Sequence, residues 1–201
     1  MSAHVAWFQD LGRDDIPSVG GKGANLGELT RAGFPVPGGF VVTAEGYIAA
    51  MDEAGVRDDL RRGFTEACAS AGDPAALAAA AEDLQERIAR AGMPDSLRAE
   101  VLEAYHRLGP EACVAVRSSA TAEDTAGTSF AGMHETFTNV VGDDDVIDQI
   151  VACWRSLYGQ RVIAYRAARG LTDEPSIAVV VQEQVAADRA GVLFTADPST
   201  G

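Results

Sequence analysis

Short apolar runs, rich in β-branched or aromatic residues, predict strands along this chain. The runs cover residues 5–8, 40–42, 113–116, 177–181 and 191–195. A further strand is predicted where Phe137, Asn139 and Val140 follow a long polar segment. A short polar connection, residues 187–190, separates the last two runs and predicts that they form a hairpin.

Apolar residues spaced three and four positions apart predict helices between these strands. Three of them fill residues 58–70, 74–90 and 95–108, a stretch without any chemically suggestive cluster, which we interpret as a structural helical lobe. Thr43 is a suitable N-cap for a helix through Met51. Asp143, Asp144 and Asp145 precede another helical pattern that continues or restarts past Gly159 to Ala168. Acidic residues suit the positive end of a helix dipole, so this run is interpreted as a cap rather than a metal site.

A glycine-rich segment, VGGKGANLGEL, follows a polar connector at residues 9–18 and predicts a tight turn at residues 20–23. A short helix is expected after the turn, ending near Gly33. The segment is not a Walker A loop, because Ile16 and Gly23 stand where that loop needs Gly and Ser or Thr. Two interpretations remain, an anion site that uses Lys22 or an ordinary turn with a solvated lysine. Since the 15 other basic residues are all arginine, the single lysine favours the anion site.

Residues 114–140 contain a second candidate region, a loop of small and hydroxyl side chains that permits close approach to phosphate oxygens. The apolar strand before it is expected to stop at Arg117. The guanidinium of Arg117 either pairs with Glu123 or Asp124 or reaches a ligand phosphate, and the local sequence does not separate these possibilities. The loop is otherwise acidic, so phosphate binding there needs help from elsewhere, and Lys22 is the candidate.

The composition of the chain argues against several classes of function. A net charge of −14 argues against nucleic-acid binding and makes Mg²⁺ an expected companion of any polyphosphate ligand. The chain lacks a long apolar run for a membrane span, and its three cysteines are expected to be buried thiols in a reducing cytoplasm. The three histidines are dispersed, which disfavours a zinc site, and no catalytic group is expected within this chain.

Four motifs in order, VGGKGANLGEL, VPGGFVVTAEGY, VAVRSSATAEDTAGTSFAGMHETFTNV and GVLFTADPSTG, resemble one family across essentially the whole chain. It is the N-terminal nucleotide-binding domain of the phosphoenolpyruvate-utilising enzymes, which include phosphoenolpyruvate synthase (pyruvate, water dikinase), pyruvate phosphate dikinase and rifamycin phosphotransferase. The start, WFQDLGRDDIPSVGGKG, favours the synthase. The resemblance implies an α+β, ATP-grasp fold. It also implies ATP contacts at a set of five residues, namely Lys22, Arg117, Gly132, Thr136 and Gln182.

The resemblance further implies that residues 1–201 are a partial ATP-grasp domain, with the glycine loop and helical lobe in about 1–110 and a sheet-rich lobe in 111–201. The Mg²⁺ ligands, the phosphohistidine domain and the acceptor domain are then expected outside this chain. Three hypotheses follow: a part of a dikinase-type phosphotransferase that is inactive alone, a stand-alone nucleotide-binding module, and a degenerate domain without a ligand. Lys22 and Arg117 together count against the third.

Overall fold

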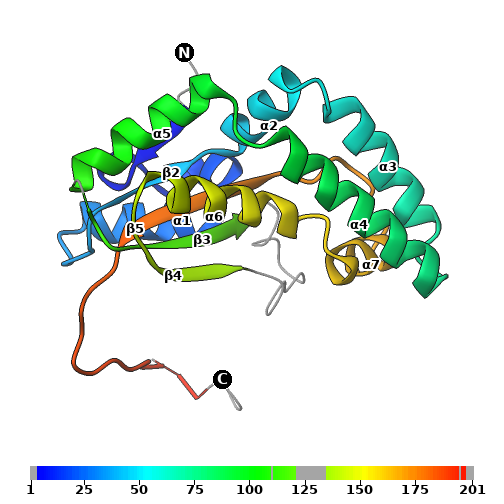
Figure 1. The fold of residues 1–201 in the computed structure, drawn as a ribbon. Coiled ribbons are helices and arrows are strands. Elements are labelled where there is room, and N and C mark those ends of the chain that lie inside the picture. The colour runs from blue at the N-terminus through cyan, green and yellow to red at the C-terminus, as the bar shows by residue number, and fades with distance from the viewer. Residues whose placement is uncertain (1–3, 110, 121–134, 195, 198–201) are drawn as a thin grey trace.

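The computed structural model describes residues 4–109, 111–120, 135–194 and 196–197. Its strands form a five-stranded sheet in the order β1-β2-β5-β3-β4, and all neighbouring strands are antiparallel (Figure 1). The strands are β1 (Val5–Trp7), β2 (Gly39–Val42), β3 (Val114–Ala120), β4 (Thr136–Val140) and β5 (Ile177–Glu183). The sheet therefore combines strands from both ends of the sequence, with β5 at its centre.

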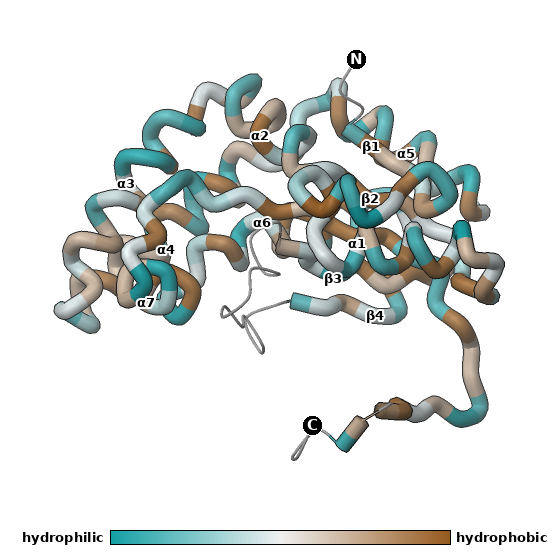
Figure 2. The backbone as a smooth tube through the Cα atoms, turned by 180° about the vertical axis from the view of Figure 1, so that it is seen from behind, coloured by the Kyte–Doolittle hydropathy of each residue, from teal (hydrophilic) through white to brown (hydrophobic). Residues whose placement is uncertain are grey.

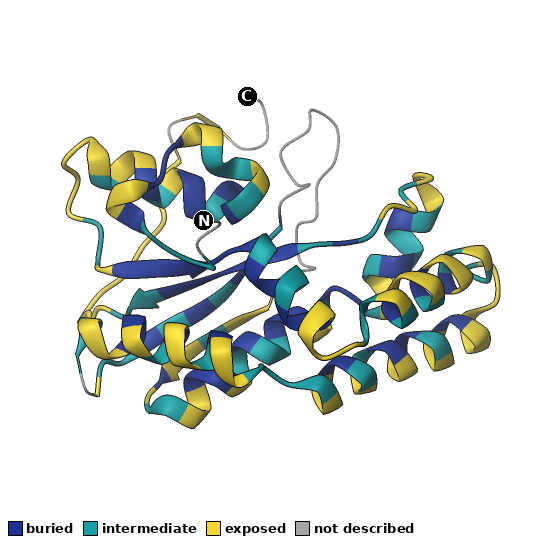
Figure 3. Cartoon of the chain, turned by 90° about the horizontal axis from the view of Figure 1, so that it is seen from above, coloured by how far each residue is buried: buried dark blue, intermediate teal, exposed yellow. Residues whose placement is uncertain are grey.

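Helices cover the two faces of the sheet unequally. One face packs on the larger hydrophobic core, to which six helices contribute. They are α2 (Ala44–Glu53), α3 (Arg57–Ala69), α4 (Pro74–Ala91), α5 (Asp95–Leu108), α6 (Asp143–Ser156) and α7 (Gln160–Ala168). The other face carries a smaller core formed with α1 (Ile16–Arg31) and the 3-10 turn Phe8–Asp10. Figure 3 shows the resulting layers, with buried strands between helices whose outward faces are exposed.

Several helix boundaries follow from the capping residues that the sequence offers. The Oγ1 of Thr43 accepts a hydrogen bond of 3.1 Å from the Gly46 amide, which confirms Thr43 as the N-cap of α2. Asp73 caps α4 through the amides of Ala75 and Ala76. Three aspartates occupy the first turn of α6, as the dipole argument predicts. The three helices of the helical lobe are confirmed, and so is the restart of α7 after Gly159.

The expected end of the third strand at Arg117 is wrong. β3 continues to Ala120, and its residues from Arg117 onward pair with β5 up to Ile177. Ser118 and Ser119 are fully buried within it. A strand tolerates such side chains because their hydroxyls bond to nearby backbone groups, as Ser118 does with Glu135. Polarity alone therefore misplaced the start of the loop.

Two other expectations also need correction. α1 begins at Ile16, so the polar connector is shorter than predicted and the helix longer. Residues 191–194 form no strand, and the side chains of Val192, Leu193 and Phe194 are 83%, 91% and 64% exposed. The predicted hairpin fails because β5 already pairs with β2 on one side and β3 on the other, which leaves no free edge beside it. Figure 2 shows this apolar segment extending away from the sheet.

The mixture of helices and antiparallel sheet confirms the α+β class and agrees with an ATP-grasp-like nucleotide-binding domain. In the described ranges, no helix combines the length and apolar character that a membrane span requires. Cys68, Cys113 and Cys153 are free thiols, of which Cys153 is buried and the other two are half-buried.

Candidate functional site

Three of the five predicted contact residues lie on the same face of the sheet. Arg117 pairs directly with Thr136 of β4 on one side and with Val180 of β5 on the other. Directly opposed residues of antiparallel strands point to the same face, with Cβ atoms about 4.5–5.5 Å apart. Val180 belongs to the smaller core under α1. Arg117 and Thr136 therefore extend the row of residues that α1 covers, and Gln182, two residues after Val180, lies on the same face.

The Arg117 side chain is half-buried on this face. Within the described residues it makes no hydrogen bond or ion pair. Glu123 and Asp124, the alternative partners, lie outside the described residues. Because β3 continues past Arg117, its guanidinium stands on a strand paired on both sides and not at a strand end. A strand of this kind is a rigid support for a ligand-binding side chain.

The other two sheet residues differ in their surroundings. Gln182 is half-buried, and its Nε2 donates a hydrogen bond of 3.3 Å to the Pro37 carbonyl, in the segment before β2. Thr136 is exposed at the start of the edge strand β4 and lines a groove of about 350 Å³ with the rest of that strand, Asp145 and Gln149. Gly132 lies outside the described residues, so its predicted contact stays a prediction.

Lys22 lies in the first turn of a helix, close to where the glycine-rich segment meets β3. The turn is narrower than predicted, since only Gly20, with φ 66° and ψ 171°, breaks the helical conformation of α1. Gly20 lies against the end of β3, where an added Cβ would be 2.6 Å from the Ser119 carbonyl oxygen and 2.8 Å from that of Ala120. Only glycine fits this contact, because both the space and the backbone conformation exclude a side chain. The glycine turn is thereby brought onto the strand that carries Arg117.

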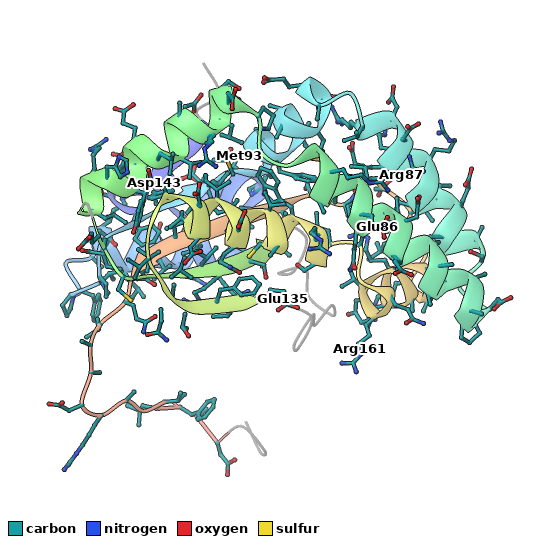
Figure 4. All side chains as sticks on the ribbon, viewed as in Figure 1. Glu86, Arg87, Met93, Glu135, Asp143 and Arg161 are labelled. Carbon is teal, nitrogen blue, oxygen red and sulfur yellow. The ribbon has the colours of Figure 1, made fainter. Side chains whose placement is uncertain are left out.

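The electrostatics of Cys153 on α6 connect Lys22 to the start of β4. The pKa of the Cys153 thiol is raised to about 12, chiefly by burial and also by the Glu135 carboxylate, while the positive charge of Lys22 acts to lower that pKa. The charges of Lys22 and Glu135 therefore act in opposite directions on the same buried thiol. Glu135 directly precedes Thr136 and lines a cavity of about 330 Å³ with the first turn of α7, including Arg161 (Figure 4).

Two residues at this junction were not among the predicted contacts. Ser119 and Gly20 bring the glycine turn and β3 together, yet the serine was assigned to a loop and the glycine only to a turn. The signal was present in the alternation of residues 114–119, because Ser119 falls two positions after Arg117 on the same face. No group of three or more His, Cys, Asp or Glu residues in the described part of the chain is arranged to hold a metal ion.

Comparison with known proteins gives one family. Residues 16–201 match the family model described as "Pyruvate phosphate dikinase, AMP/ATP-binding domain". A protein of Methanothermobacter thermautotrophicus called a probable phosphoenolpyruvate synthase is 42% identical over 207 residues, which cover 100% of this chain and 30% of that protein. A probable phosphoenolpyruvate synthase of Archaeoglobus fulgidus is 45% identical, covering 98% of this chain and 27% of the relative. The phosphoenolpyruvate synthase of Aeropyrum pernix is 40% identical, covering 98% and 25% respectively.

The match to the family model spans far more than half of the chain, and the similarity to these relatives covers nearly all of it. The chain itself spans 25% to 30% of the length of these three relatives. The combination of helices with an open antiparallel sheet agrees with this match. The chain belongs to the pyruvate phosphate dikinase AMP/ATP-binding domain family.

Proposed function

We propose that this chain is the ATP-binding part of a dikinase-type phosphotransferase whose parent enzyme is a phosphoenolpyruvate synthase. The observation that carries the proposal is the junction of the glycine turn with β3. The turn that precedes Lys22, the only lysine, contacts the strand that carries Arg117, whose side chain makes no hydrogen bond or ion pair within the described residues. The names of the similar proteins favour the synthase over a rifamycin phosphotransferase.

In this proposal each of the five residues contacts a different part of the nucleotide. Lys22 acts as a compact positive charge on the phosphates at a helix start, and Arg117 binds a phosphate through its planar fork of N–H donors. Gly132 and Thr136 contact the nucleotide from the loop before β4 and from its first residue. Gln182 contacts it from β5, where its Nε2 donates to Pro37 and its Oε1 accepts no hydrogen bond from the described residues.

The chemistry beyond binding is assigned to parts of the parent enzyme outside this chain. Mg²⁺ would neutralise phosphate charge, with its carboxylate and amide ligands expected after Gly201. The proposed reaction converts ATP, pyruvate and water to phosphoenolpyruvate, AMP and phosphate through a phosphohistidine on a separate domain. We assign no catalytic residue to this chain. We also propose that the parent enzyme is located in the cytoplasm.

Thermal unfolding with and without MgATP tests the binding step. Saturation to 100 times the dissociation constant stabilises a protein by about 2.7 kcal/mol. For a chain of this size that corresponds to a rise in Tm of roughly 5–11 °C. Lys22→Ala and Arg117→Ala should each remove most of the shift. Arg90→Ala, which removes an exposed arginine paired with Glu86 on α4, should leave it intact.

A wild-type chain whose Tm does not respond to millimolar MgATP would contradict nucleotide binding by this chain. A shift that survives both Lys22→Ala and Arg117→Ala would place the nucleotide elsewhere. The acceptor is tested separately, in the parent enzyme, by comparing phosphorylation of pyruvate with phosphorylation of rifamycin.

A further inference from the structure

Ser119 of β3 contacts the glycine turn through its hydroxyl group, and its side chain is fully buried. The Oγ donates a hydrogen bond of 2.8 Å to the carbonyl of Val19, immediately before Gly20. The same Oγ accepts a bond of 3.4 Å from the amide of Gly23, immediately after Lys22. One hydroxyl therefore bonds to the backbone on both sides of the break in α1.

This arrangement replaces a missing helix cap. The helical segment that carries Lys22 starts after Gly20, which makes Gly20 its N-cap and Gly23 its third residue. An N-cap side chain ordinarily accepts the hydrogen bond of that third amide. Gly20 has no side chain to do so, and the carbonyl oxygens of Ser119 and Ala120 leave no room for one. The hydroxyl of Ser119 supplies the acceptor from the neighbouring strand.

The consequence concerns the distance between the two cations. Ser119 and Arg117 lie on the same face of β3, two residues apart, which is about 6.6 Å along a strand. The hydroxyl ties the backbone on either side of Lys22, at Val19 and at Gly23, to the strand that carries Arg117. We propose that Ser119 is a positioning residue, whose hydroxyl holds Lys22 in register with Arg117 for binding a polyphosphate. This inference rests on the proposed nucleotide site and adds a residue to it.

The single lysine provides a selective probe. Protein labelled with ¹⁵N only in lysine gives one backbone amide signal, from Lys22, in a nuclear magnetic resonance spectrum. In Ser119→Ala this signal should move or broaden without any nucleotide present, because the turn loses its anchor. The matched control is Asp73→Ala, which removes the N-cap of α4 in the helical lobe. It should lower the overall stability similarly but leave the Lys22 signal in place.

Titration with MgATP then tests whether the position matters for binding. Lys22→Ala should weaken binding at least about tenfold, the effect of losing one hydrogen bond to a charged group. Ser119→Ala should weaken it about 3- to 10-fold when Lys22 is present, and by less than about 2-fold in the Lys22→Ala background, because it acts through the lysine. Asp73→Ala should bind MgATP like the wild type.

Equal weakening by Ser119→Ala with and without Lys22 would overturn the inference, as would an unchanged Lys22 signal in Ser119→Ala. If wild-type protein does not bind MgATP, the proposed function fails instead. The anchoring role of Ser119 is then decided by the Lys22 signal in Ser119→Ala and Asp73→Ala.

Discussion

Replacing Gly20 with alanine would place a methyl group where the structure has no space for one. The backbone at φ 66° and ψ 171° is essentially restricted to glycine, and holding another residue there costs about 1–3 kcal/mol. The new Cβ would also lie 2.6 Å and 2.8 Å from the carbonyl oxygens of Ser119 and Ala120, which are backbone atoms of β3 where it pairs with β5. Overpacking of this kind adds another ~1–3 kcal/mol. Together these costs predict that Gly20→Ala lowers the free energy of unfolding by roughly 2–6 kcal/mol, unless the turn separates from β3.

Both outcomes can be measured together. Urea unfolding followed by circular dichroism gives the loss of stability, and MgATP titration reports whether Lys22 stays in place. Gly55→Ala is the matched control, since Gly55 also has a positive φ of 69° but nothing within 4 Å of an added Cβ. It should lose only about 1–2 kcal/mol from backbone strain and keep its affinity for MgATP. The reasoning is refuted if Gly20→Ala is no less stable than Gly55→Ala and binds MgATP as tightly as the wild type.

Two further predictions concern the larger core. Burial raises the pKa of the Cys153 thiol from 9.0 to about 12. Between pH 9 and pH 12, the folded state therefore keeps a thiol proton that the unfolded state loses. The associated stability is complete below pH 9 and is lost as the pH rises toward 12, by at most about 1.4 kcal/mol per pH unit. Urea unfolding of Cys153→Ala should show a shallower decline over this range, and an identical decline would contradict the assignment. The hydroxyls of Tyr47 and Tyr158 are buried 3.1 Å apart, so Tyr158→Phe should cost about 1–3 kcal/mol by leaving its partner unsatisfied. Adding Tyr47→Phe should recover part of that loss, and strictly additive losses in the double variant would show that the hydroxyls are not coupled.

Local sequence patterns predicted most of the elements because helices and their caps depend on residues close in sequence. Thr43 and the acidic start of α6 marked helix ends in this way. The failures involved neighbours that are distant in the sequence. β3 extends past Arg117 because β5, more than 50 residues later, pairs with it, and residues 191–194 lack a strand because β5 has no free edge.

The candidate site likewise combines features that depend on the local sequence with features that depend on residues distant in the sequence. Lys22 and Arg117 were predicted from residue type, since a single lysine among glycines and a charge on an apolar strand are both visible in the sequence, and their contact with a nucleotide stays a prediction. Their connection was not visible, because it runs through a hydrogen bond between residues 100 positions apart, Val19 and Ser119. Sequence patterns could therefore identify the charged groups but not the hydroxyl between their supports.

The net charge of −14 and a polyphosphate ligand are compatible because the charge is unevenly arranged. Several carboxylates of the helical lobe are already paired with arginines, as Asp59 is with Arg62 on α3 and Asp83 with Arg87 on α4. These pairs belong to helices on the opposite face of the sheet from Arg117. Exposed charges separated by more than about 10 Å interact weakly at physiological salt. In the proposed site the phosphates would therefore respond mainly to Lys22 and Arg117, because the glycine turn that carries Lys22 is anchored to the strand that carries Arg117.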